Sequence, residues 1–255
     1  MQLVMQAPDE GEFYELDPMV PKHWQRIGRA VTARLRQLGL WRQRGSVLKG
    51  IDPTDEDAIL GMGAWGWAYK LPTTPPVVLK VTEDPSEGPI TARVMSDRVL
   101  HDMEGVVNFQ GLWQLPEPAA RSARTIYVLL REYLEEEAFL DDEDEELLWA
   151  AREAAGAYNA QSGWHEAALI RAADKSRQQM MEYLLELQRN PDAEALIEFM
   201  LEFYRRTGAA LADIHPGNIG TREDDDTWVV FDLGHTKLEA APNIDALPNP
   251  GAEPL

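Results

Sequence analysis

Hydrophobic residues follow different patterns in the two halves of the chain. In the first half they form short β-prone runs separated by glycines and a proline-rich turn, which is typical of strands. We expect these strands at 58–62, 65–71, 77–81 and 125–130. A helix is expected between the third and the fourth of them, from Pro85 to about Met103.

The second half is dominated by apolar residues at three- and four-residue spacing, which predicts helices from about 145 to 208. Pro191 is expected in the first turn of the last helix, where a missing amide proton costs no helical hydrogen bond. Two short strands are expected next, near 219–221 and 228–231. The proline-containing residues 241–255 are expected to form an irregular tail.

The segment between Asp17 and Asp52 contains eight basic residues and no acidic one. Its apolar residues recur at helical spacing, which predicts an amphipathic helix from about Val20 to Gly39 with a basic opposite face. The apolar stripe consists of Trp24, Ile27, Val31, Leu35 and Leu38. We expect this stripe to dock on the following domain, and contact with a partner, a membrane or nucleic acid is the alternative.

Composition and charge narrow the class of protein. The 44% hydrophobic and 27% charged residues are typical of a folded globular chain, and its net charge of -20 argues against general nucleic-acid binding. The absence of cysteine excludes disulfides, thiolate zinc sites and a cysteine nucleophile. We expect a cytoplasmic protein without a membrane span, because neither a leader pattern nor an apolar run of about 18 residues is present. The acidic residues from Glu135 to Glu146 are expected to form a solvated loop and helix start.

Three glycines, Gly61, Gly63 and Gly66, form a G-x-G-x-x-G pattern. Aromatic and β-prone residues and then Pro72 follow it, so we expect a hairpin folded over phosphates and not the strand-to-helix turn of a dinucleotide-binding fold. Ala68, two residues after the third glycine, is placed to pack beneath an adenine ring. An ordinary glycine-containing hairpin is the alternative.

Lys80 is a charged residue inside the apolar run from Val77 to Val81. A desolvated ammonium group needs an anionic partner, which phosphates or a carboxylate could supply. Glu87, near the start of the next expected helix, is the best placed carboxylate, and Glu104 is the alternative. The competing interpretation is an edge-strand lysine that reaches solvent.

Asp213 and Asn218 lie five residues apart in an expected loop, and Asp232 follows after a strand, a turn and a strand. Asn218 and Asp232 offer hard oxygen ligands of the kind that Mg²⁺ prefers. Asp213 is then placed to accept the proton of an attacking hydroxyl. The alternative makes all three residues turn formers or caps.

In this order, and over about residues 58 to 240, these motifs resemble the protein kinase-like superfamily. The resemblance implies a two-lobed α+β fold with ATP in the cleft between the lobes. It assigns 51–134 to an N-lobe with a small antiparallel sheet and 135–240 to a mainly helical C-lobe. A basic N-terminal segment at 1–50 precedes the lobes, and the tail at 241–255 follows them.

The resemblance also implies roles for individual residues in binding the phosphates. Gly61, Gly63 and Gly66 would cover the phosphates, as the glycine-rich loop does in the family. Lys80 would bind the α- and β-phosphates, and Glu87 would pair with Lys80.

The remaining family roles concern the adenine, the metal and the reacting hydroxyl. Ala68 and the hinge that contains Glu132 would contact the adenine. Asp213 would be the catalytic base, and Asn218 and Asp232 would bind Mg²⁺.

The catalytic-loop sequence is more similar to the aminoglycoside and choline kinase branch than to eukaryotic protein kinases, because Leu211 and Ala212 precede Asp213 and His215 follows it. We therefore expect an Mg-ATP-dependent phosphotransferase that transfers the γ-phosphoryl group to a hydroxyl of a small-molecule or protein acceptor. One alternative is a kinase-like enzyme that transfers AMP. The other is a pseudokinase, a nucleotide-binding interaction module that docks a partner through its basic N-terminal helix.

Overall fold

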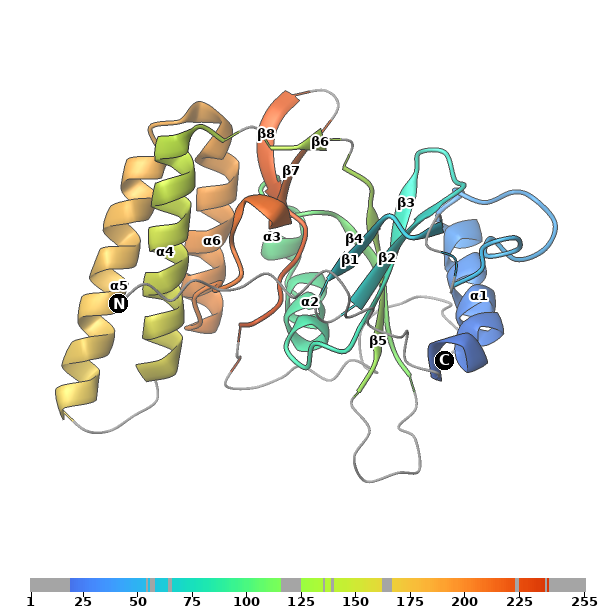
Figure 1. Ribbon diagram of the computed structural model, residues 1–255, viewed down its shortest axis with the longest axis horizontal. Helices are drawn as coiled ribbons and strands as arrows, with labels where there is room; N and C mark the ends of the chain where they lie inside the picture. Colours follow the sequence, from blue (N-terminus) through green and yellow to red (C-terminus); the bar gives the residue numbers. More distant parts are fainter. Residues whose placement is uncertain are drawn as a thin grey trace.

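The computed structural model describes residues 19–53, 55, 58–63, 66–115, 125–134, 136–138, 140–161, 167–222, 225–236 and 238. It shows an α+β protein in which a small antiparallel sheet lies beside a group of helices (Figure 1). The expected tail at 241–255, the first 18 residues and Glu135 of the acidic run lie outside the described residues.

The larger sheet has five antiparallel strands in the order β1-β2-β3-β5-β4. They are β1 (Gly61–Gly63), β2 (Gly66–Leu71), β3 (Val77–Thr82), β4 (Phe109–Gln114) and β5 (Tyr127–Glu132). β2, β3 and β5 confirm the predicted strands, and β1 occupies the end of the first predicted run. β4 was not expected, because its sequence FQGLWQ mixes a glycine and two glutamines with the apolar residues and shows no regular alternation.

Helix α1 (Met19–Gln37) covers one face of this sheet (Figure 1). Its residues Ile27, Val31 and Leu35 are buried against strand residues that include Leu79, which confirms that the apolar stripe docks on the rest of the domain. Leu38 was wrongly placed in the stripe: it is 39% exposed, because the helix ends at Gln37. Partner contact through the exposed basic face stays a prediction.

Deleting residues 1–45 is expected to leave the protein insoluble or to lower its melting temperature strongly. Each of the buried α1 side chains contributes about 1.5–3 kcal/mol through burial, and the deletion would also expose the sheet face beneath them. Thermal unfolding measures the effect. Deletion of residues 1–18, which leaves α1 whole, is the matched control, and equal melting temperatures of the two truncated proteins would show that α1 is a detachable arm.

The opposite face of the sheet packs on α2 (Glu87–Ser96), which is followed by the short α3 (Arg98–His101). The single helix expected from Pro85 to Met103 is thus divided at Asp97, whose backbone is extended. The Asp97 carboxylate accepts a hydrogen bond from the Val99 amide and so caps α3.

The helical part contains α4 (Asp142–Gln161), α5 (Ala167–Leu187) and α6 (Glu194–Thr207), with α4 and α5 packed side by side (Figure 1). Pro191 begins the short 3-10 turn η2 (Pro191–Ala193) directly before α6, so its expected role as a helix start is confirmed to within one turn. α6 ends at Thr207 and is capped by Gly208, which takes the left-handed conformation with φ of 72°.

A second sheet has the order β6-β7-β8 and is formed by β6 (Glu136–Glu137), β7 (Ile219–Arg222) and β8 (Asp225–Val230). β7 and β8 are the two strands expected after the helices, and they pair as an antiparallel hairpin. Within the described residues, no helix combines the length and the apolar character needed to cross a membrane.

Candidate functional site

Lys80 occupies the middle strand of the larger sheet, so the interpretation as an edge-strand lysine is wrong. Side chains alternate between the faces of a strand, and Lys80 lies on the face that packs on α2. Its Nζ lies 2.7 Å from Glu87 Oε1 and 2.5 Å from Asp232 Oδ2, and only 12% of its side chain is exposed. Glu104 is exposed, so the structure gives the pairing with Lys80 to Glu87.

The three charges of this cluster shift one another's pKa values. Burial opposes the charge of Lys80, but Asp232 and Glu87 outweigh burial and raise the pKa of Lys80. Burial and the Asp232 charge raise the pKa of Glu87 to about 7, although Lys80 acts in the opposite direction. Burial also disfavours the charge of Asp232, yet Lys80 and the Gly234 amide bring the pKa of Asp232 below its ordinary value. The cluster therefore holds an ionised Lys80–Asp232 pair with a more weakly ionised Glu87 beside it.

Arg131 supplies a second buried positive charge near this cluster and was not predicted as a site residue. It lies on β5, and burial lowers its pKa to about 10 against the opposing effect of Asp232, Glu87 and Glu132. The guanidinium carbon lies 4.7 Å from the centre of the Phe231 ring, next to Asp232 in the sequence. Two cations thus lie near Asp232, which follows the end of β8.

The β7–β8 hairpin brings Asn218 and the Asp232 segment together. Asn218 ends the 3-10 turn η3 (Pro216–Asn218), and its backbone carbonyl accepts a hydrogen bond of 3.0 Å from the Phe231 amide. The Asn218 side-chain amide donates to the Asp213 carbonyl at 2.9 Å, which ties the turn to the loop after α6. Residues that are separated by a strand, a turn and a strand in the sequence therefore meet at one place, as their spacing predicted.

Asp213 is held by a cation that was not predicted from the sequence. Arg152 Nη2, from α4, lies 3.3 Å from Asp213 Oδ1, and the Asp213 side chain is 11% exposed. His215 Nε2 lies 3.8 Å from the same oxygen, and burial is the main cause that lowers the pKa of His215. Trp149 stacks on the His215 ring at 5.6 Å and also lies beneath the Arg152 guanidinium. Arg152 is the single basic residue in the sequence of α4. This isolated positive charge could have identified it as a candidate site residue.

Asp84 is a second residue of the site that was not predicted from the sequence. Its carboxylate accepts hydrogen bonds from the Ser86 amide at 2.7 Å and hydroxyl at 2.6 Å, and from the His235 amide at 3.1 Å. Ser86 directly precedes Glu87, and His235 follows the Asp232 turn. Asp84 therefore connects the two segments that supply the partners of Lys80.

The same contact explains the glycine of the D-x-G motif. A Cβ atom at Gly234 would lie 2.5 Å from Asp84 Oδ2, closer than Cβ atoms are found to neighbouring atoms, and in a tight contact of 3.3 Å with Asp213 Oδ2. Both carboxylates are nearly buried and are held by hydrogen bonds or ion pairs. Position 234 thus requires glycine, because the neighbouring carboxylates occupy the space that a side chain would need.

The glycine hairpin has the expected strand pairing, with Gly61 opposite Ala68 and Gly63 opposite Gly66. A Cβ atom at Gly66 would lie 2.3 Å from the carbonyl oxygen of Val81, so this glycine is required by the close packing of β2 on β3. Gly61 is exposed and has open space around it. The turn residues 64 and 65 lie outside the described part of the chain.

The two residues expected to contact adenine lie close to this hairpin and sheet. Ala68 is half-buried and stands opposite Lys80 in the β2–β3 pairing. Glu132 ends β5, and its carboxylate accepts hydrogen bonds from the Asn108 amide at 3.1 Å and from Arg222 Nη2 at 2.8 Å. Its side chain thus joins β5 to β7 of the second sheet.

The side-chain oxygens of Asn218 and Asp232 suit Mg²⁺ better than a metal ion that takes most of its ligands from the protein. Among the described residues, no group of three or more His, Cys, Asp or Glu side chains could hold a metal ion. Mg²⁺ is commonly bound by one or two protein oxygens together with phosphates and water. The Asn218 nitrogen is used by the Asp213 carbonyl, so its side-chain oxygen is the atom left for a ligand.

Comparison with protein-family models gives no match, and comparison with curated proteins gives none either. Function must therefore be inferred from the arrangement of these side chains.

Proposed function

We propose that the protein is an Mg-ATP-dependent phosphotransferase with a two-lobed kinase-like fold, its lobes at 51–134 and 135–240. The main support is the position of Lys80, which contacts Glu87 from α2 and Asp232 from the end of the β7–β8 hairpin. A scaffold protein has no physical need to bury a lysine with two carboxylates from such distant segments. The acceptor is a hydroxyl of a small molecule or a protein.

The phosphates of ATP would bind where the positive charges of the cluster meet the glycine hairpin. Lys80 binds the α- and β-phosphates while Glu87 holds its ammonium group in place, and the charge of Arg131 adds to the field there. Gly61, Gly63 and Gly66 cover the phosphates. Ala68 and the backbone near Glu132 contact the adenine.

Asn218 and Asp232 would hold the magnesium ion, and the bound ion would neutralise the charge that develops on the phosphates. Lys80 contacts Asp232 directly, so the same carboxylate links the metal to the phosphate-binding lysine. Loss of Asp232 would therefore affect both groups.

Asp213 would orient the acceptor hydroxyl and receive its proton. The acceptor oxygen forms a new bond to the γ-phosphorus, the bond between this phosphorus and the bridging oxygen breaks, and ADP leaves with the electron pair. Arg152 and His215 lie beside one oxygen of Asp213 and fix the orientation of the carboxylate. Most of the catalysis is thus positioning and charge stabilisation.

The labelled products of ATP distinguish this proposal from its alternatives. Incubation of the purified protein with γ- and α-labelled ATP and a pool of acceptors is expected to give ADP and to transfer only the γ label. Release of pyrophosphate with transfer of the α label would instead show an AMP-transferring enzyme.

The nucleotide site can be tested without an acceptor. Saturating Mg-ATP is expected to raise the melting temperature, because a ligand at a hundredfold excess over its Kd adds about 2.7 kcal/mol to the free energy of unfolding. A melting temperature unchanged by Mg-ATP and by Mg-GTP would contradict the site. Stabilisation by Mg-ATP without either labelled product, across acceptor pools, would favour the pseudokinase.

A further inference from the structure

The acceptor of the proposed reaction has to lie against the side chains around Asp213, because this carboxylate would hold its hydroxyl. Among the described residues, three basic side chains surround the two carboxylate oxygens. Arg152 and His215 lie beside Oδ1, and His235 Nε2 lies 3.9 Å from Oδ2. All three are partly exposed, whereas Asp213 itself is nearly buried. The groups next to the acceptor hydroxyl must therefore suit basic surroundings.

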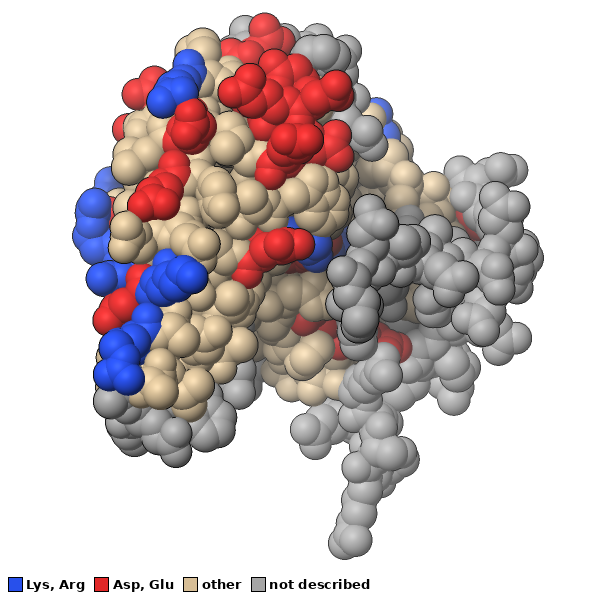
Figure 2. Space-filling view, turned by 60° about the vertical axis from the view of Figure 1, so that its left-hand side comes forward, with Lys and Arg blue, Asp and Glu red and all other residues tan. Residues whose placement is uncertain are grey.

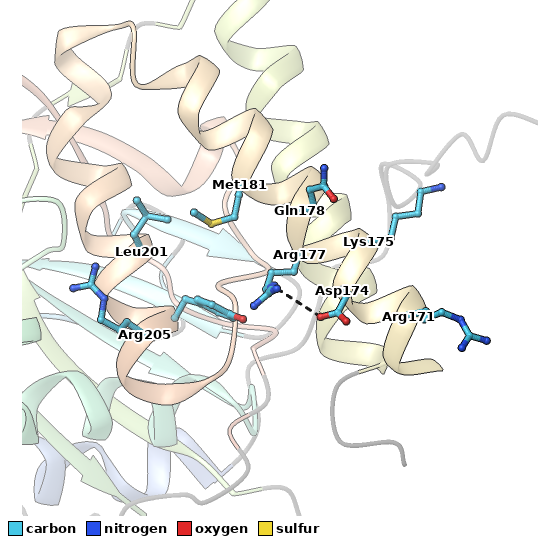
Figure 3. Close-up of a pocket in the computed structure, with 9 residues that line it drawn as sticks. Arg171, Asp174, Lys175, Arg177, Gln178, Met181, Leu201 and Arg205 are labelled. Carbon is cyan, nitrogen blue, oxygen red and sulfur yellow. Dashed lines mark ion pairs between the residues drawn. The ribbon is translucent and has the colours of Figure 1, made fainter. Parts of the chain in front are cut away.

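A pocket of about 910 Å³ between α5 and α6 lies apart from these side chains (Figure 3). Met181, Leu201 and Tyr204 form its apolar wall. None of the residues that line it is among the three that surround Asp213. We therefore expect the acceptor beside α4 and not in this pocket.

Arg152 is the side chain best suited to recognise the acceptor. A guanidinium group has five N–H donors, and Arg152 uses one of them, on Nη2, in its contact of 3.3 Å with Asp213. Its Nε is buried without a hydrogen-bond partner among the described residues. The side chain keeps 26% of its surface exposed, so a ligand beside Asp213 can reach it. A ligand with oxygen acceptors would use donors that the contact with Asp213 leaves over.

Trp149 holds the guanidinium group of Arg152 in place. Its ring centre lies 4.8 Å from the guanidinium carbon, and its indole nitrogen donates to Glu145 Oε1 at 3.2 Å. A guanidinium group over an aromatic ring can still direct a pair of N–H donors at a carboxylate or a phosphate. The ring is 38% exposed, but the protein already supplies the cation that it attracts. An acceptor with its own ammonium group would therefore meet a like charge here.

The acidic residues of α4 do not cancel this positive charge. Figure 2 shows acidic side chains gathered at the top of the molecule, which is the end at which α4 begins in Figure 1. The acids of the first turn, Asp142 to Glu145, precede Arg152 by about 10–15 Å along the helix. Exposed charges at such distances are largely screened at physiological salt, where the Debye length is about 8 Å.

We propose that the acceptor is a small hydroxy compound with a carboxylate or phosphate group close to its hydroxyl, and that Arg152 binds this anionic group. The assignment rests on the proposed function, in which Asp213 holds the hydroxyl and the hydroxyl oxygen attacks the γ-phosphorus. The anionic group itself does not react. Arg152 also offsets the repulsion between this group and the phosphates of ATP.

The contact between Arg152 and Asp213 limits the size of the acceptor. Because the two side chains touch, the anionic group and the hydroxyl they bind belong to neighbouring or nearly neighbouring atoms of one molecule. A serine or threonine in a protein chain has no anionic group so close to its hydroxyl. A small molecule is therefore favoured over a protein acceptor.

Separation of an acceptor pool by charge tests the proposal. The small molecules of a cell extract, freed of nucleotides on charcoal, are divided by ion exchange into anionic, neutral and cationic fractions. Each fraction is incubated with the full chain and γ-labelled Mg-ATP, and labelled product is expected chiefly from the anionic one. Product chiefly from another fraction, or only in the proteins of the extract, would overturn the proposal and leave the phosphotransferase activity intact. Absence of transfer to every fraction and to protein would count against the proposed function itself, and the proposal would fall with it.

The source of the negative charge is identified in the same assay. The anionic fraction is treated with a phosphatase, which is removed before Mg-ATP is added. Loss of the labelled product would assign the charge to a phosphate group of the acceptor, and an unchanged product would assign it to a carboxylate.

Arg152→Gln distinguishes binding of the anion from positioning of Asp213. The value of kcat/KM for the anionic acceptor is expected to fall about tenfold to a hundredfold further than the rate of ATP hydrolysis, in which water replaces the acceptor. Both reactions need Asp213, but water carries no anionic group. Equal losses in the two reactions would show that Arg152 acts only through Asp213 and would overturn the assignment. Arg152→Lys keeps the charge and is expected to recover part of the loss in KM, and Arg189→Gln, at an exposed arginine, is the matched control.

Discussion

Asp213→Asn is expected to lower the rate of phosphoryl transfer by about a hundred- to ten-thousandfold, which is the range that a positioned general base contributes. The amide has almost the shape of the carboxylate and can still accept a hydrogen bond from Arg152, but it cannot accept the proton of the acceptor hydroxyl. The affinity for Mg-ATP is expected to change little, because Asp213 makes no contact with Lys80, whose partners are Glu87 and Asp232.

Separate measurements of turnover and of ATP binding are needed to observe this difference. The turnover number is determined from transfer of the γ label, and the Kd of Mg-ATP from its effect on thermal unfolding. Asp226→Asn, which changes an exposed carboxylate on β8, is the matched control and should leave both quantities unchanged. A variant Asp213→Asn that transfers at the rate of the unaltered protein would show that Asp213 is not the proton acceptor.

Much of the strand and helix pattern could be predicted, because regular burial leaves a regular sequence pattern. β3 packs between α1 on one face and α2 on the other, and its six residues are apolar except for Lys80 and Thr82. β4 gave no such pattern, since Gly111 and its two glutamines interrupt the apolar residues. The division of the helix at Asp97 depends on a cap and on an ion pair with Arg206, which lies 109 residues further along the chain.

The candidate site was predictable where a single charge interrupts an apolar run or where hard ligands have a fixed spacing. Lys80, Asn218 and Asp232 were found in these ways, and the structure brings Lys80 into contact with Asp232 across 152 residues. Asp84 and Arg152 were missed because their roles arise from tertiary contacts. The amide bound by Asp84 is 151 residues away, and Arg152 meets Asp213 across 61 residues. Asp84, at a turn before a helix, has the sequence context of an ordinary cap.

Lys80→Met is expected to destabilise the protein by about 3–5 kcal/mol near pH 8, because removal of one partner leaves buried charge without compensation. Methionine fills nearly the same volume as the lysine stem, so the loss is chiefly electrostatic. Glu87 and Asp232 would remain close together without the cation that both contact. The free energy of unfolding in urea measures the effect. Lys49→Met, at an exposed lysine, is the control and should change this free energy by less than about 0.5 kcal/mol.

The pH dependence distinguishes lost charge compensation from lost packing. The pKa of Glu87 in the folded protein is about 7, above its ordinary value of 4.5, so its contribution to stability is fully present below pH 4.5 and is lost as the pH rises through 7. Without Lys80 the pKa values of both carboxyl groups in the folded state rise further, which enlarges this loss at high pH. The difference in unfolding free energy between Lys80→Met and the unaltered protein should therefore be larger near pH 8 than near pH 5.

A second substitution in the same background completes the test. Glu87→Gln combined with Lys80→Met removes one of the two uncompensated carboxylates and is expected to recover part of the lost stability near pH 8. The same Glu87→Gln change in the unaltered protein removes a partner of Lys80 but leaves the Lys80–Asp232 pair. In the unaltered protein, Glu87→Gln should therefore change the free energy of unfolding less favourably than it does in the Lys80→Met background. The reason is that Lys80, the cation that Glu87 stabilises, is still present there. A destabilisation by Lys80→Met that is independent of pH, and that Glu87→Gln does not reduce, would mean that Lys80 contributes through packing and that the charged cluster does not hold these segments together.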